Sequence, residues 1–128
     1  MFYLVNTPWW IKILFPVGIW DIPSASNTIY LTFDDGPHPQ ITPFVLEELR
    51  KYNAKGTFFC IGSNVEQYRE IYDEILQQGH GVGNHTQDHL NGWIVSDEDY
   101  LINILQAQKH IESNLFRPPY GRIKKRQA

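Results

Sequence analysis

The fold is decided at residues 29–37, which read IYLTFDDGP. The first five, Ile29 to Phe33, are β-branched, aromatic or aliphatic and favour a short strand, and the Asp-Gly-Pro that follows is a turn signal. Asp34 and Asp35 therefore stand where a strand ends. Side chains of neighbouring residues leaving a strand point in different directions, so the two carboxylates can perform two different tasks.

After Asn27 the chain alternates predicted strands with predicted helices. Strands are expected over residues 29–33, 55–61, 81–84 and 115–118. Helices are expected over residues 42–53 and 63–79 and from residue 96 onward, with a further helix beginning at residue 121. Their start signals are Thr42-Pro43, a capping box at Ser63-Asn64-Val65-Glu66, and Ser96 before three acids. The order βαβαβαβ predicts an α/β fold with parallel strands, whose functional sites gather at the C-terminal strand ends.

Composition excludes several classes of protein. The 128 residues suffice for one domain, and 42% hydrophobic with 20% charged residues is ordinary for a globular protein. A net charge of −3 gives no reason to expect a nucleic-acid partner. No segment approaches the roughly 20 uninterrupted apolar residues of a membrane span. The one cysteine, Cys60, lies in an apolar run and is expected to be a buried thiol rather than a nucleophile.

Residues 1–26 form an aromatic-rich extension ahead of the domain expected over residues 27–128, with three tryptophans at positions 9, 10 and 20. The extension makes a poor export signal, because no basic segment precedes it and Pro8, Lys12 and Pro16 interrupt it. The cellular location is therefore unknown: cytoplasmic by default, with action at the envelope or outside the cell open. Packing on the domain is the plainer expectation for this extension, and anchoring at a membrane surface is the alternative.

Two histidines, in HTQDH at residues 85–89, follow the strand predicted over residues 81–84. Residues four apart on a helical turn have Cβ atoms ~5–6 Å apart, which suits two ligands of one ion. A carboxylate and two imidazoles form a three-ligand set that leaves a coordination position for water on a hydrolytic metal. Alone, the histidines could be surface or helix-capping residues, and Asp88 could orient a ring or be a solvated acid.

A third motif, RPPY at residues 117–120, ends the last predicted strand. It could be only a rigid strand terminus. Its functional interpretation is a guanidinium, that of Arg117, placed beside Asp34 to keep this carboxylate ionised and oriented. Three chemical motifs from separate segments thus meet at one rim of the predicted sheet.

At these residues the chain resembles the polysaccharide deacetylase family, carbohydrate esterase family 4, whose catalytic unit is the NodB-homology domain. TFDDGP at residues 32–37 resembles its first motif, HTQDH its second and RPPY its third, and the resemblance covers residues 27–123. It implies a distorted β/α barrel. It also implies a site in which Asp34 is the base, Asp35, His85 and His89 bind the metal, Arg117 tethers Asp34, and the Tyr120 N–H helps to hold the oxyanion.

The resemblance further implies a divalent metal, zinc by default with cobalt or nickel as alternatives. The implied reaction is hydrolysis of N-acetyl groups on amino sugars of peptidoglycan, chitin-like or other N-acetylglucosamine glycans. Two alternatives stay open. One is a non-catalytic glycan-binding or assembly module that keeps the metal site. The other is a phosphoesterase, which is less favoured because few basic residues lie near the motifs to bind a phosphate.

The family's domain is longer, with two further motifs, one of which supplies a general-acid histidine. No histidine follows His110 in this chain. We therefore expect the N-terminal part of the barrel, with a metal site and weak or no turnover, because general acid–base help contributes about 10²–10⁴-fold. An open sheet edge would also favour self-association.

Overall fold

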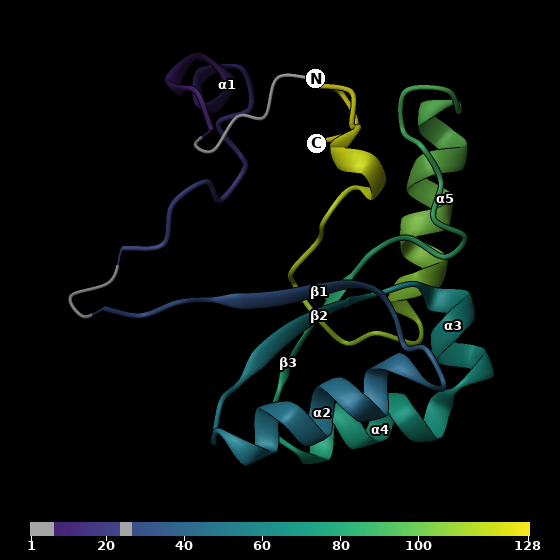
Figure 1. The fold of residues 1–128 in the computed structure, drawn as a ribbon. Helices are drawn as coiled ribbons and strands as arrows, with labels where there is room; N and C mark the ends of the chain where they lie inside the picture. The colour runs from purple at the N-terminus through teal and green to yellow at the C-terminus, as the bar shows by residue number, and fades with distance from the viewer. Residues whose placement is uncertain (1–6, 24–26) are drawn as a thin grey trace.

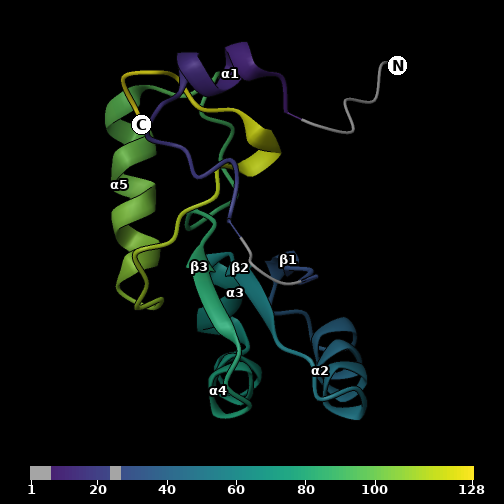
Figure 2. The same cartoon turned by 90° about the vertical axis from the view of Figure 1, so that its left-hand side faces the viewer.

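The computed structural model describes residues 7–23 and 27–128 (Figures 1 and 2). Its centre is a parallel sheet in the order β1-β2-β3, formed by Leu31–Gly36, Gly56–Cys60 and Gly81–Asn84. Because the strands run in the same direction, their C-terminal ends share one edge. The predicted α/β class with parallel strands is confirmed.

The described helices are α1 (Trp9–Leu14), α2 (Ile41–Lys51), α3 (Gly62–Gln67), α4 (Arg69–Gln77), α5 (Asp97–Gln108) and the 3₁₀ turn η1 (Pro119–Gly121). Helix α2 connects β1 to β2, and α3 and α4 connect β2 to β3. In both views α2 and α4 lie side by side below the sheet (Figures 1 and 2), and Figure 2 shows α5 on the β3 side of the sheet.

The hydrophobic core fills the space between the sheet and the helices that cover it. Its buried members are Leu46, Leu49, Phe58, Cys60, Val65, Tyr72, Ile75, Ala107 and Ile111. Phe33 of β1 stacks on Phe58 of β2 with ring centroids 4.9 Å apart, which ties the first strand to this core. Cys60 is fully buried, and burial raises its thiol pKa to about 12, so the predicted structural thiol is confirmed.

Two helix starts differ from the predictions. Thr42 is not the N-cap of α2, because the backbone N–H groups of Gln40 and Ile41 donate instead to Nδ1 of His38, at 3.2 and 3.3 Å. No capping box forms at α3, whose N-cap is Ile61. Glu66 contacts His110 at 2.7 Å instead of reaching back to the helix start.

The helix predicted over residues 63–79 is two helices. Tyr68 separates α3 from α4, with non-helical dihedrals of φ −124° and ψ 49°.

The prediction that Ser96 caps the third predicted helix is confirmed at α5, since its Oγ accepts the backbone N–H of Asp99 at 3.0 Å. On α5, Leu105 is half exposed, whereas Tyr100 and Asn103 are buried.

The fourth strand is reduced to one parallel bridge between Asn84 and Phe116. Pro118 and Pro119 follow, and neither has a backbone N–H to extend the ladder. The chain then turns through η1 rather than beginning the helix expected at residue 121. The bounds of β1 also differ from the prediction. It begins at Leu31 rather than Ile29, and it continues through Asp34 and Asp35 to Gly36.

The described part of the N-terminal extension does not pack into the domain. Helix α1 buries none of its residues, and Trp9 is 73% exposed. The preferred expectation that this extension packs on the domain is therefore wrong for residues 7–23, where Pro8 and Pro16 bracket little more than one helical turn. Among the described helices, none has the length and apolar character needed to cross a bilayer.

His80, which stands between Gly79 and Gly81, is a buried residue. It is 7% exposed, and its Nδ1 accepts the backbone N–H of Gly56 at 3.2 Å. Its ring lies edge-on to Phe58 with centroids 5.5 Å apart. Burial, helped by the charge of Lys55, lowers the His80 pKa below 6.5, so the folded protein holds a neutral imidazole.

Acidification through the ordinary histidine pKa should therefore destabilise the fold. Between about pH 7.5 and pH 5.5 the unfolded chain takes up a proton at His80 that the folded chain resists, so the free energy of unfolding falls. The loss ends below the lowered pKa of the folded state. Urea denaturation at the two pH values measures it. His80→Asn, whose amide oxygen can accept the Gly56 N–H, should show a smaller loss; an equal loss would contradict the assignment to His80.

Candidate metal centre and its surroundings

Asp35, His85 and His89 meet at the C-terminal edge of the sheet. Oδ1 of Asp35 lies 3.3 Å from Nε2 of His85 and 3.1 Å from Nε2 of His89, and the three ligand atoms lie within 4.8 Å of one another. A tetrahedral ion with bonds of about 2.0–2.2 Å holds its ligand atoms roughly 3.3–3.6 Å apart. The three side chains therefore fit one metal ion of this kind.

The backbone takes unusual conformations to bring these side chains together. The pairing of β1 with β2 skips Asp35, which bulges out of the strand with φ 67°. Thr86 and His89 are also left-handed, with φ 66° and 56°. Such conformations cost of the order of 1 kcal/mol or more each outside glycine, and they concentrate where function requires them. Bulges likewise re-aim side chains next to active sites.

The hydrogen bond of His85 fixes which of its nitrogens can bind a metal. Its Nδ1 lies 2.7 Å from the carbonyl oxygen of Arg117, which can only accept, so Nδ1 carries the proton. Nε2 is left with a lone pair, facing Oδ1 of Asp35. Burial lowers the His85 pKa and favours this neutral form. Two acceptors face each other here, an arrangement that a bound cation would stabilise.

A clamp from α5 holds the loop between the two histidines. Oδ1 of Asn103 accepts the backbone N–H groups of Gln87 and Asp88 at 2.9 and 3.0 Å, while its Nδ2 donates to Asp88 at 2.6 Å. Asp88 is exposed, as expected for a solvated loop acid, but its carboxylate also accepts this hydrogen bond from Asn103 and no contact with a histidine ring is seen for it among the described residues. Oδ1 of Asn84 accepts the Thr86 N–H at 2.8 Å and fixes the start of the same loop.

Asp34 lies beside the three candidate ligands and contacts Arg117, as the sequence predicts. Arg117 Nη1 donates to Oδ1 of Asp34 at 2.6 Å and to Oγ1 of Thr32 at 3.0 Å. The guanidinium lies over the ring of Phe59, 4.0 Å from its centroid. Arg117 therefore has a fixed position, and both Thr32 and Phe59 support it without having been identified from the sequence.

Tyr120 completes the rim of the site from η1. Its backbone is left-handed, with φ 59°, and its ring stands edge-on to the ring of His89 with centroids 4.6 Å apart. All six residues singled out in the sequence therefore lie at one edge of the sheet. Sequence reasoning missed Asn84 and Asn103, which hold the loop between the two histidines. The one signal in the sequence was an amide side chain among apolar residues, next to a strand end for Asn84 and on a helix face for Asn103.

Comparisons with known proteins agree with this geometry. Residues 21–128 match the family model described as polysaccharide deacetylase. The chain is 43% identical over 119 residues to a peptidoglycan-N-acetylglucosamine deacetylase of Bacillus cereus, covering 88% of this chain and 56% of that protein. It is 42% identical over 107 residues to a chitooligosaccharide deacetylase of Azorhizobium caulinodans, covering 78% and 51%.

The fold is also similar to that of a solved relative. The structure of the peptidoglycan deacetylase PdaC from Bacillus subtilis matches with a TM-score of 0.78 and 38% identity, over 83% of this chain and 55% of that one. The chain thus spans about half the length of the curated relatives it matches. Sequence, fold and site agree, and the chain belongs to the polysaccharide deacetylase family.

Proposed function

We propose that this chain carries the metal site of an enzyme that hydrolyses N-acetyl groups from amino sugars in a glycan. One observation carries the proposal: Asp34, held by Arg117 at 2.6 Å, stands next to Asp35, which faces His85 and His89. Similarity to proteins named as peptidoglycan and chitooligosaccharide deacetylases supports an N-acetylated glycan as the substrate class.

Asp35, His85 and His89 would hold a divalent ion through one oxygen and two nitrogen atoms. This donor set suits zinc first, with cobalt and nickel as alternatives. When bound, such an ion polarises an acyl carbonyl and lowers the pKa of water. The protein supplies the geometry, because the Arg117 carbonyl and the Asn103 clamp fix the histidines before any ion arrives.

Asp34 takes the proton of the attacking water in this proposal. Its carboxylate is a strict acceptor when ionised, and Arg117 occupies one of its oxygens, so the other remains to face the reacting centre. The backbone N–H of Tyr120 would stabilise the developing oxyanion, an interaction of about 3–4 kcal/mol per donor in acyl transfer. The two adjacent aspartates thus have separate roles.

Exposed aromatic rings beside the site favour a sugar substrate. Tyr120 and Trp93 are 63% and 60% exposed. Arg122 lies between them, 5.9 Å from the Tyr120 ring centroid and 5.3 Å from that of Trp93. The apolar faces of pyranose rings pack on such aromatic side chains, so a glycan chain could extend from His89 across Tyr120 toward Trp93.

Three of the five histidines have other contacts. His38 accepts backbone N–H groups at the start of α2, His80 accepts the Gly56 N–H just before β3, and His110 contacts Glu66. The general acid that the family resemblance implies is thus assigned to none of them. We propose that the 128-residue chain binds the metal but turns substrate over slowly, since general acid help is worth about 10²–10⁴-fold.

Metal titration and acetate release test this function together. Calorimetry with Zn²⁺, Co²⁺ and Ni²⁺ should show one ion bound per chain, and N-acetylglucosamine oligomers should release acetate slowly, in a reaction that EDTA stops. Absence of divalent binding, or acetate release that EDTA leaves unchanged, would contradict the proposal. Metal and glycan binding with no acetate under any condition would favour the non-catalytic glycan-binding module.

A further inference from the structure

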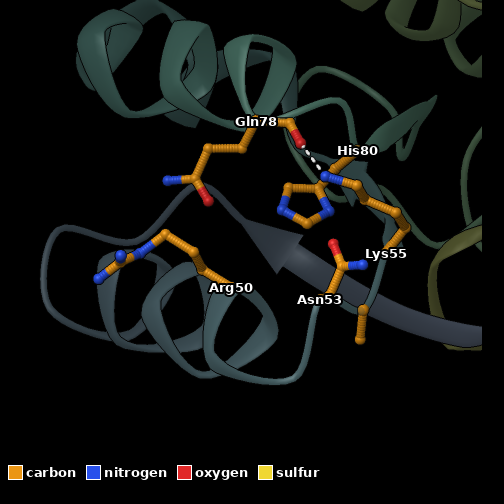
Figure 3. A pocket seen from close by; sticks show the side chains of 6 residues that line it. Arg50, Asn53, Lys55, Gln78 and His80 are labelled. Carbon is orange, nitrogen blue, oxygen red and sulfur yellow. Dashed lines mark hydrogen bonds between the residues drawn. The ribbon is translucent and has the colours of Figure 1, made fainter.

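A pocket lined mostly by polar side chains lies at the opposite edge of the sheet from the metal centre. It is about 220 Å³ in volume and is lined by Arg50, Asn53, Ala54, Lys55, Gln78 and His80 (Figure 3). These residues lie where α2 and α4 end and where β2 and β3 begin. Two of them are cationic and none is acidic, so the lining favours a negatively charged ligand.

His80 contributes a buried hydrogen-bond donor that has no acceptor. Because Nδ1 accepts the Gly56 N–H, the neutral ring carries its proton on Nε2. This atom is buried and finds no partner among the described residues. Figure 3 shows the ring turned toward the middle of the pocket, between Gln78 and Asn53. A buried N–H without an acceptor is costly, so the site is suited to a ligand that provides one.

The two cations flank this donor. Lys55 Nζ donates to the carbonyl oxygen of Gln78 at 2.5 Å, which holds the ammonium group beside the pocket with two further N–H groups to spare (Figure 3). Arg50 has no carboxylate within ion-pair distance in the described structure. The neighbouring Lys51 differs, because it pairs with Glu47 at 3.2 Å and Glu48 at 2.8 Å.

We infer that this pocket binds a small oxyanion, a phosphate group or a carboxylate, which accepts the Nε2–H of His80 and faces Arg50 and Lys55. Guanidinium and ammonium groups form charge-assisted hydrogen bonds with oxyanions, so the two cations would provide most of the binding affinity. The neutral His80 donor would orient the bound oxyanion. The inference does not depend on the metal, because the pocket lies at the N-terminal strand ends and shares no residue with Asp34, Asp35, His85 or His89.

The experiment uses the 128-residue chain with its metal removed by EDTA, so that phosphate cannot bind at the metal centre. Titration with inorganic phosphate or acetate, with chloride at equal ionic strength as the reference, is followed through the ¹⁵N signal of His80 Nε2. We expect a saturable shift with at least one oxyanion. The two arms distinguish a phosphate-type from a carboxylate-type ligand.

Matched variants locate the binding. Arg50→Gln should weaken oxyanion affinity about tenfold or more, the scale of one charge-assisted hydrogen bond. Lys51→Gln, which removes the adjacent but paired cation, should leave the affinity unchanged. Equal effects of the two variants, no saturable shift at tens of millimolar, or the same shift with chloride would each overturn the inference and leave water as the partner of His80.

Discussion

Asp35→Asn should lower the affinity for divalent metal by more than about 100-fold. Replacing even an outer partner of a metal ligand costs 10–100-fold, and this change removes the carboxylate that lies 3.3 and 3.1 Å from the two histidine Nε2 atoms. Asparagine has the size of aspartate and tolerates the left-handed backbone at φ 67°, so the bulge should persist. Competition with a chromogenic chelator measures the affinity.

Asp73→Asn is the matched control, because it makes the same chemical change at an exposed acid that pairs with Arg69 on α4. Its metal affinity should equal that of the unaltered chain. Circular dichroism should confirm that both variants are folded. Wild-type affinity in Asp35→Asn would mean that the ion binds elsewhere, and the three-residue site would have to be abandoned.

The general plan of the fold could be predicted because its signals are local. The apolar run before Asp34 and the glycine-bounded run before His85 mark strand ends, and parallel strands bring those ends to one edge. The contact between Arg117 and Asp34 followed from the same reasoning. The residues that act chemically were thus identifiable from strand order and side-chain type.

The supporting contacts could not be predicted, because they join residues far apart in sequence. Asn103 clamps a loop 15 positions earlier, and His80 caps the start of a strand 24 positions earlier. The break between α3 and α4 at Tyr68 and the shortened fourth strand could not be predicted either. Tertiary contacts and prolines there override local preferences that favour longer elements.

The bulge at Asp35 shows what a sequence pattern leaves open. Alternation along a strand already separates neighbouring side chains, so different roles for the two aspartates could be anticipated. The structure achieves the separation differently: Asp34 stays in register opposite Phe59, while Asp35 leaves the ladder toward the histidines. The carbonyl oxygen of Asp35 accepts the Asn64 side chain at 2.9 Å, which stabilises the bulged backbone.

Asp34→Asn is expected to lower acetate release by about 10²–10⁴-fold, the usual contribution of a general base, while leaving metal affinity near the unaltered value. The amide oxygen can still accept from Arg117, so the local geometry should persist, but an amide cannot take a proton from water. Acetate released from N-acetylglucosamine oligomers at saturating metal measures the effect, in this chain or in the longest protein that its gene encodes.

The pair of measurements separates the roles of the neighbouring aspartates. Asp34→Asn should affect turnover alone, whereas Asp35→Asn should affect metal affinity and, through it, turnover. Loss of metal affinity in Asp34→Asn would make Asp34 a ligand and contradict its assignment as the base. Full activity in Asp34→Asn would move the base to another group, and the 2.6 Å contact with Arg117 would then serve only to hold the end of β1.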